Sequence, residues 1–376
     1  MHIYRFTNPN NLDTFTDWFS IGAAIGVKAN IMSWVLNKRD SMQHKIKLGE
    51  RTVFRSDPAL RFVQSRMNTL LVPLFEKLPD TDHVIAYRKG ITATDVVRNV
   101  PHAKTFISFD VRHYYDNITL PMIEQSLSQL GLPRLGARLI GRYCIVKKGQ
   151  RHTLQQGSPT SPVISNIVGH FLLDKPVLAW LENSGVKVTY LRYCDNVAFF
   201  VHEDCPDDFP KLLKDFVKET YKKTGFKTHK WATVADNHPV MHQKFLGMVI
   251  NAEARAELDV FNRLRAMLFN ACRFGFPIEA EKYLAIRGIR IPRHINAKEL
   301  CTDKYVQHLR GHVQYIKRLN RKQGLMLEKL YKAAEFFSEN DLLVKVCNNY
   351  ISAVKQYRNS MESVDDYVKR VQNSIH

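Results

Sequence analysis

The feature that most constrains the fold is an alternation of strand-like and helix-like segments within residues 100–255. Apolar runs with strand character fall at residues 105–111, 186–192, 197–202 and 245–251. Between them, apolar residues recur at helical spacing over residues 120–130, 159–173 and 209–224. This alternation predicts an α+β domain built around a sheet.

The segments on either side have a different character. Residues 1–104 combine helical runs, such as residues 60–78, with a few short strands. From about residue 253 to the end, strands disappear and helical periodicity takes over. We therefore expect three parts, at residues 1–104, 105–252 and 253–376.

Two of the predicted strands end in a carboxylate. One, Phe106-Ile-Ser-Phe-Asp110, is followed by the aromatic pair Tyr114 and Tyr115, and the other leads into Tyr193-Cys-Asp195-Asn196. Each is explained equally well by a turn, and Asp-Asn between two apolar runs makes a good hairpin loop. Two Asp side chains on adjacent strand ends would also suit a pair of divalent cations, which prefer oxygen ligands.

A third segment lies between these two in the chain. Gln156-Gly157-Ser-Pro leads into a helix-like run with Pro near its start. Glycine lets the backbone approach a ligand closely, and hydroxyl groups at a helix N-terminus suit phosphate contact. A Gly-Ser-Pro turn is nevertheless common by itself.

The charge balance points to a polyanionic partner. The 55 Lys and Arg outnumber the 36 Asp and Glu, which gives a formal charge of +19. Residues 282–322 alone hold 11 basic and 2 acidic residues, a net +9. A charge run is usually a solvated helix face, but so few acids favour contact with a phosphate backbone.

Cysteine spacing and hydropathy bear on the compartment. The six Cys lie far apart with no C-x-x-C pair, which argues against a disulfide framework or a zinc site. No stretch has the length of a membrane span or the pattern of a signal peptide. We expect a cytoplasmic protein that does not contact a membrane.

Taken together, the three segments resemble the palm motifs of reverse transcriptases. These motifs are F-x-x-x-D-x-x-x-(F/Y)-(F/Y), Q-G-x-x-x-S-P-x-x-x-N and Y-x-D-D, and further matches follow at Gly225-Phe-Lys-Thr-His-Lys230 and Lys244-Phe-Leu-Gly247. Upstream, Arg51-Thr-Val-Phe-Arg55 and Ala86-Tyr-Arg-Lys-Gly90 resemble the fingers motifs of the bacterial branch, which includes group II introns, retrons and stand-alone defence-associated enzymes. The resemblance implies an α+β right-hand polymerase with fingers, a ferredoxin-like palm and an all-helical thumb.

The resemblance also implies a catalytic centre. Asp110 and Asp195 would ligate two Mg²⁺ ions, with the carbonyl of Val111 as a further ligand. Tyr115 falls where the family keeps an aromatic ring beneath the sugar 2′ position, a site that favours dNTPs over rNTPs. Lys230 matches a late-palm lysine that can protonate the leaving pyrophosphate. A core aromatic and an exposed structural lysine are the alternatives for Tyr115 and Lys230.

Further residues are implied as contacts to nucleotide and nucleic acid. Gln156 and Gly157 would line the nucleotide side, and Arg51 would reach the triphosphate from the fingers. The helical thumb would contact the template–primer through its basic residues, which are Arg287, Arg290, Arg293, Lys317, Arg318, Arg321 and Lys322. The partners implied are an RNA template, noncoding in the defence-associated subtypes, together with dNTPs and the DNA product. A protein partner or a homo-oligomer stays open.

One residue departs from the family pattern. Asn196 replaces the second acid of Y-x-D-D, so the site has one negative charge fewer for holding metals, which would be compatible with Mn²⁺ as well as Mg²⁺. The departure leaves two alternatives beside an active reverse transcriptase. One is an RNA-dependent RNA polymerase, against which Tyr115 argues, and the other is an inactive or scaffold subunit.

Overall fold

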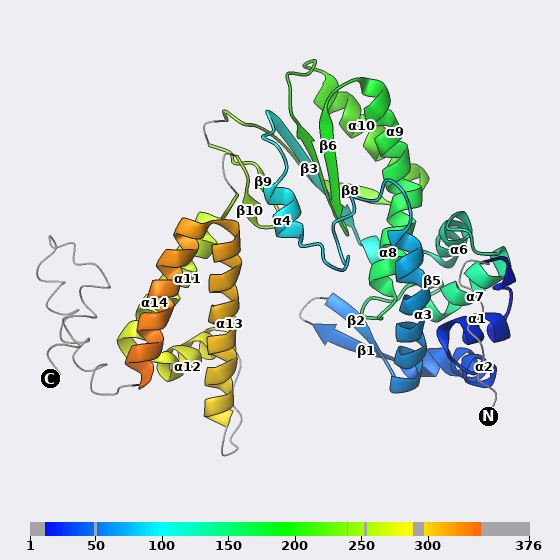
Figure 1. Cartoon of the computed structure of the whole chain (residues 1–376), viewed down its shortest axis with the longest axis horizontal. Helices are drawn as coiled ribbons and strands as arrows, with labels where there is room; N and C mark the ends of the chain where they lie inside the picture. The colour runs from blue at the N-terminus through cyan, green and yellow to red at the C-terminus, as the bar shows by residue number, and fades with distance from the viewer. Residues whose placement is uncertain (1–11, 49–50, 239, 252–253, 289–296, 340–376) are drawn as a thin grey trace, which may run out of the picture. The chain divides into compact units, whose positions relative to one another are not determined.

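The computed structural model describes residues 12–48, 51–238, 240–251, 254–288 and 297–339. The chain divides into two compact units, residues 1–243 and 244–376 (Figure 1). The boundaries expected from the sequence at residues 104 and 252 stay predictions.

The first unit contains a four-stranded antiparallel sheet with the strand order β6-β7-β3-β8. Its strands are β3 (Thr105–Arg112), β6 (Val188–Tyr193), β7 (Asn196–Val201) and β8 (Lys227–Ala235). Helical segments connect β3 to β6 and β7 to β8, whereas β6 and β7 form a hairpin. A βαββαβ connection with this order is the ferredoxin-like arrangement, so the predicted palm fold is confirmed.

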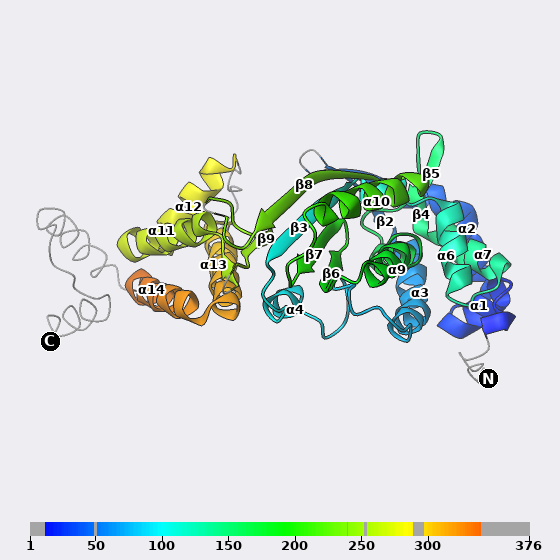
Figure 2. The ribbon, with the colours of Figure 1, turned by 90° about the horizontal axis from the view of Figure 1, so that it is seen from above.

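Aromatic packing joins this sheet to α10 (Phe209–Lys223) and α10 to α9 (Lys175–Ser184), and the two helices lie beside each other in both views (Figures 1 and 2). Phe109 of β3 stacks on Trp231 of β8 at 4.3 Å between ring centroids and meets Tyr221 of α10 edge-on. Trp180 of α9 stacks on Phe216 of α10. Offset and edge-on aromatic pairs add stabilisation beyond the area that they bury.

The rest of the first unit consists of helices and two hairpins. The hairpins pair β1 (Gln43–Leu48) with β2 (Arg51–Ser56), and β4 (Ile145–Lys148) with β5 (Arg151–Leu154). The helices before the sheet are η1 (Leu12–Thr14), α1 (Trp18–Ile25), α2 (Ala29–Lys38), η2 (Arg39–Met42), α3 (Pro58–Glu76) and α4 (Ala93–Arg98). Those after β3 are α5 (Tyr114–Asn117), α6 (Leu120–Gln129), α7 (Arg134–Cys144), α8 (Ser161–Gly169) and the π-helix η3 (His170–Asp174). The helices expected at residues 60–78 and 120–130 are confirmed by α3 and α6.

The second unit is mainly helical over its described residues. Its helices are α11 (Leu258–Phe274), α12 (Phe276–Ile286), α13 (Ala297–Leu319) and α14 (Arg321–Glu339). Gly324 permits close packing within the α13–α14 pair, since a Cβ there would lie 2.0 Å from the Cα of Lys317.

Two sequence expectations about short strands were wrong. The single strand expected at 245–251 is instead the hairpin of β9 (Lys244–Phe245) and β10 (Met248–Val249), because Leu246 and Gly247 turn the chain with φ of 50° and 75°. Strands also do not end at residue 253, because β11 (Arg255–Ala256) pairs with β10.

Among the described helices, none is by itself long and apolar enough to cross a bilayer. Only the pair formed by residues 18–25 and 29–42 meets the length and composition required, and it is bent by 109°.

Candidate active site

The two predicted metal ligands lie at the same end of the sheet. Asp110 of β3 is the cross-strand partner of Asn196 at the start of β7. The peptide N–H of Val111 donates to the carbonyl of Asp195 at 2.7 Å, which fixes the β6–β7 turn against β3. The ladder also corrects the expected Asp-Asn loop, because Tyr193 pairs with Asn196 and the turn itself consists of Cys194 and Asp195. Cys194 makes this tight turn with a left-handed φ of 56°.

A cavity of about 1060 Å³ opens over these residues. Seven of the predicted site residues line it, namely Asp110, Val111, Tyr115, Gln156, Asp195, Asn196 and Lys230. Segments 85 residues apart in the chain thus come together as the palm resemblance implies. The size of the cavity suits a nucleotide-sized ligand.

The donor set of this site fits a divalent cation. Two carboxylates and a backbone carbonyl are hard oxygen ligands, and the residues that carry them, Asp110, Asp195 and Val111, all line the cavity. In the structure, the Lys230 ammonium lies 3.2 Å from Asp110 Oδ2 and supplies a positive charge at that carboxylate. Asn196 Nδ2 donates to Asp195 Oδ1 at 3.2 Å, so the amide of Asn196 orients this carboxylate.

The carbonyl of Asp110 is itself held by a neighbouring ring. Nδ1 of His229 lies 3.1 Å from this oxygen, and because a carbonyl only accepts, Nδ1 carries the proton. His229 also lines the cavity, although it was not predicted from the sequence as a site residue.

Tyr115 is held by hydrogen bonds and not by core packing alone. Its hydroxyl donates to that of Tyr87 at 3.3 Å and accepts from the Cys194 thiol at 3.4 Å. Tyr114, in contrast, is fully buried and donates to the carbonyl of Ser165. Burial, together with the nearby Cys194, raises the pKa of Tyr115 far above its usual value, so this hydroxyl stays protonated. Tyr87 was not identified from the sequence, although it lies in the fingers motif Ala86-Tyr-Arg.

Three consecutive residues of the Gln-Gly loop, Gln155, Gln156 and Gly157, make different contacts. Gln156 lines the cavity, whereas the preceding Gln155 is buried and bonds to Ser56, Gln64 and Gln43. Gly157 does not line the cavity, and its close approach is to protein backbone, because a Cβ there would lie 2.6 Å from the carbonyl oxygen of Phe54. This contact explains the glycine without a ligand, and the expected nucleotide contact of Gly157 stays a prediction.

The cavity also has basic lining residues that the sequence did not predict. Lys45 of β1 and the pair Lys147 and Lys148 of β4 line it. Arg51 begins β2, but its side chain lies outside the described residues, so its contact with a triphosphate stays a prediction. The signal missed in the sequence was the run Lys147-Lys-Gly-Gln-Arg151-His, four basic or titratable residues around a glycine turn.

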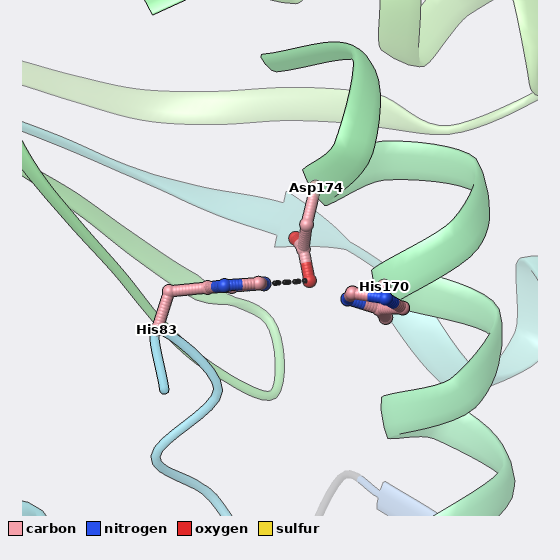
Figure 3. Close-up of side chains that lie close together, drawn as sticks. All are labelled: His83, His170 and Asp174. Carbon is pink, nitrogen blue, oxygen red and sulfur yellow. Dashed lines mark hydrogen bonds and ion pairs between the residues drawn. The ribbon is translucent and has the colours of Figure 1, made fainter. Parts of the chain in front are cut away.

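A buried polar cluster bonds to β6, the strand that leads into the Cys194-Asp195 turn, and Figure 3 shows three of its side chains. Asp174 accepts bonds from Arg192, from Tyr190 and from His83, the last at 3.0 Å. Burial by itself would raise the pKa of Asp174, but the Arg192 guanidinium and His83 hold it well below its usual range. Arg192 also donates to the carbonyls of Asn166 and Cys194 and to Tyr114, so each of its nitrogens has a partner and its side chain supports the turn.

The same cluster offers a set of metal-ligand types. Ligand atoms of His83, His170 and Asp174 lie within 4.8 Å of one another. Arg192 already neutralises Asp174 and would repel a divalent cation at this distance. We therefore interpret the cluster as a structural network.

In the second unit, four of the seven predicted nucleic-acid contacts have described and exposed side chains: Arg287, Arg318, Arg321 and Lys322. Arg287 lies over the ring of Tyr283 at 4.1 Å. Lys317 bonds both carboxylate oxygens of Glu328, so its charge is already balanced between α13 and α14. Arg290 and Arg293 lie outside the described residues.

Comparisons with known proteins agree with this geometry. The family model described as "Reverse transcriptase (RNA-dependent DNA polymerase)" matches residues 54–250. The chain is similar to the retron Mx65 reverse transcriptase of Myxococcus xanthus, with 22% identity over 83% of this chain and 70% of that protein. It is 24% identical to the retron Ec73 reverse transcriptase of Escherichia coli, over 48% of this chain and 58% of that protein.

A solved structure of telomerase from Candida albicans with a telomeric RNA fragment overlaps 83% of this chain and 69% of its own, at 12% identity and a TM-score of 0.43. A likeness of this size carries no further conclusion. The family match covers more than half of the chain and includes the strand ends, the Gln-Gly loop and the turn described above. The resemblance to the bacterial branch is confirmed, and the chain belongs to the reverse transcriptase (RNA-dependent DNA polymerase) family.

Proposed function

We propose that this protein adds dNTPs to a primer 3′ end on an RNA template by two-metal-ion catalysis. The observation that carries the proposal is the meeting of Asp110, Asp195 and the Val111 backbone at one wall of a nucleotide-sized cavity. These groups would hold two Mg²⁺ ions, with Mn²⁺ as an accepted substitute. When bound, such ions lower the pKa of the primer hydroxyl and neutralise charge on the phosphates.

The side chains around this site would orient the nucleotide. Tyr115, fixed by Tyr87 and Cys194, would place its ring beneath the sugar and exclude a 2′-hydroxyl. Gln156 would contact the nucleotide from the opposite loop, and Arg51 would contact its triphosphate.

Lys230 is positioned for two successive tasks. Its ammonium pairs with Asp110 in the structure, and its side chain is 73% exposed, so it is free to move toward a bound polyphosphate. There it would donate a proton to the leaving pyrophosphate.

The proposal extends to the biological setting. Likeness to retron reverse transcriptases supports a noncoding RNA template and a role in antiviral defence, with the basic thumb helices on the template–primer backbone. All five described cysteines are free thiols, which suits a reducing cytoplasm.

Primer extension by the purified protein tests the proposal. With an RNA template, a DNA primer and Mg²⁺, we expect dNTP incorporation that Asp110→Asn abolishes. Incorporation of rNTPs but not dNTPs would identify an RNA polymerase instead. An unmodified protein that binds template–primer but is inactive with both Mg²⁺ and Mn²⁺ would identify a scaffold subunit.

Sequencing of co-purified nucleic acid tests the setting. A discrete small RNA, alone or joined to DNA, is expected. If cells carrying Asp110→Asn resist phage as well as cells carrying the unmodified protein, the proposed defence role of polymerisation is wrong.

A further inference from the structure

The β4–β5 hairpin carries an unusual density of positive charge. From Ile145 to Leu154 it contains Lys147, Lys148, Arg151 and His152 and no acidic residue. Its turn is Gly149-Gln150, with Gly149 at a φ of 60°, and Figure 2 shows the hairpin projecting from its unit. Lys147, Arg151 and His152 are all exposed.

The register of this hairpin opposes one pair of like charges. Lys148 is the cross-strand partner of Arg151, whereas Lys147 faces the imidazole of His152. Like charges directly opposite each other destabilise a strand pair, so the arrangement has a cost in the free protein. A bound polyanion would relieve that repulsion.

The cations of the hairpin differ in how they are paired. Lys148 bonds Asp116 and lies over the ring of Phe54, so two residues that line the cavity hold the turn end of the hairpin. Within the part of the chain that the structure describes, no carboxylate forms an ion pair with Lys147 or Arg151. These two charges are therefore the ones available to a ligand.

The hairpin lies beside the candidate active site. Lys147, Lys148 and Gly149 line the same cavity as Asp110 and Asp195, whereas Arg151 and His152 lie beyond its lining. The positive charge thus extends from the cavity wall across the hairpin to its second strand, where Arg151 lies opposite Lys148. A phosphodiester backbone that enters the cavity carries a phosphate at every nucleotide, so it can contact both Lys147 in the lining and Arg151 beyond it.

We propose that the β4–β5 hairpin is a nucleic-acid interface, in which Lys147 and Arg151 contact phosphates of the template–primer next to the catalytic carboxylates. The inference rests on the polymerase function proposed above and assigns it a contact surface in the first unit, separate from the basic thumb helices. Phosphate is the chemistry that the hairpin recognises, and the polynucleotide backbone is its source.

The test uses the full chain with the double substitution Lys147→Gln/Arg151→Gln. Lys148 is retained because its ammonium is hydrogen-bonded to the carboxylate of Asp116. The matched control is Lys211→Gln/Lys218→Gln, which removes the same charge from exposed positions on α10. Binding of a labelled RNA–DNA template–primer is measured over a series of salt concentrations, and the KM for dNTP is measured in the same preparations.

We expect the hairpin variant to bind template–primer at least several-fold more weakly than the control variant. The slope of log K against log[salt] should become shallower by roughly 0.7–0.9 for each phosphate that the variant no longer neutralises. The KM for dNTP should stay within about twofold, and the melting temperature should not fall, since an opposed pair of like charges has been relieved.

Three results would overturn the inference. An equal loss of affinity in the control would assign the effect to net charge, and an unchanged salt slope would make the hairpin a solvated surface. A raised KM for dNTP with unchanged template–primer affinity would assign Lys147 to the triphosphate. The binding measurement does not require nucleotide incorporation. If the protein incorporates no nucleotide but its binding of template–primer still depends on the hairpin, the proposed function is refuted and this inference stands.

Discussion

Val111 and Asp195 are joined by a backbone hydrogen bond of 2.7 Å, although 84 positions separate them in the chain. The bond runs from the strand that carries Asp110 to the turn that carries the second carboxylate. Because it is made by main-chain atoms, it persists when either carboxylate is replaced. Loss of a metal ligand can therefore be separated experimentally from loss of the fold.

Replacing Asp195 by Ala should abolish nucleotide incorporation and leave the melting temperature in EDTA within a few degrees of that of the unmodified protein. The side chain is only partly buried at a solvent-facing turn, so its removal creates no core cavity. Primer extension and thermal unfolding, run side by side, check both parts. Detectable incorporation at a normal rate would remove Asp195 from the metal site.

Restoring the second acid with Asn196→Asp should lower the Mg²⁺ concentration needed for half-maximal incorporation by several-fold. The added carboxylate lies across the ladder from Asp110 and next to Asp195, so it increases the negative charge that attracts the metal. Without metal, repulsion between the added carboxylate and those of Asp110 and Asp195 should lower the melting temperature in EDTA, and Mg²⁺ should restore it. A metal requirement that does not change would show that Asn196 lies outside the coordination sphere.

Tyr115→Val should admit rNTPs while dNTP incorporation continues. Tyr87→Phe removes the acceptor of the Tyr115 hydroxyl but keeps the ring, so we expect a smaller loss of sugar discrimination. Single-nucleotide incorporation with matched dNTP and rNTP measures both. If Tyr87→Phe has no further effect in a Tyr115→Phe background, the two hydroxyls act together, whereas additive effects would argue against a shared hydrogen bond.

The sequence alone predicted those strands in which an apolar pattern and a family motif fall on the same residues. Asp110 lies in an apolar strand and Asp195 in the turn between two apolar strands, and the structure contains these strands as the β3–β7 ladder and the β6–β7 hairpin. The sequence alone did not predict features that depend on contacts between distant segments of the chain. The Cys194-Asp195 turn depends on register, and Gly157 is required by the Phe54 carbonyl from a distant strand. Neither feature can be recognised from the residues next to it in the sequence.

The buried cluster could not be foreseen for the same reason. His83, His170, Asp174 and Arg192 come from a loop, a π-helix and a strand, and only the fold brings them together. His170 is 1% exposed, and neither of its ring nitrogens has a hydrogen-bond partner in the described structure. Such a group is neutral in the native state, which makes stability depend on pH.

Burial lowers the pKa of His170 to about 4, with the nearby Asp174 opposing the shift. An unfolded chain has a His pKa near 6.5, so the native state binds fewer protons between those values and its stability falls as pH decreases through that range. The loss amounts to about 3 kcal/mol and is complete near pH 4. His170→Phe should reduce this dependence, since Phe cannot be protonated. Denaturant unfolding at pH 7 and pH 5 checks it, and an equal pH dependence in the variant would contradict the assignment.

Reversing the charges of Arg318, Arg321 and Lys322 to Glu should weaken template–primer binding and shorten the extension products. These residues flank the junction of α13 and α14, and Lys317 is left in place because its bonds to Glu328 join the two helices. If the three side chains contact phosphates, the salt dependence of binding should become flatter by roughly 0.7–0.9 for each of those phosphates. The rate of the first incorporation per bound complex should change little, because none of the three lines the cavity that holds Asp110 and Asp195. Binding isotherms at several salt concentrations, with single-turnover incorporation, separate these effects. Unchanged affinity and salt slope would make this junction a solvated surface and leave template–primer binding to other parts of the chain.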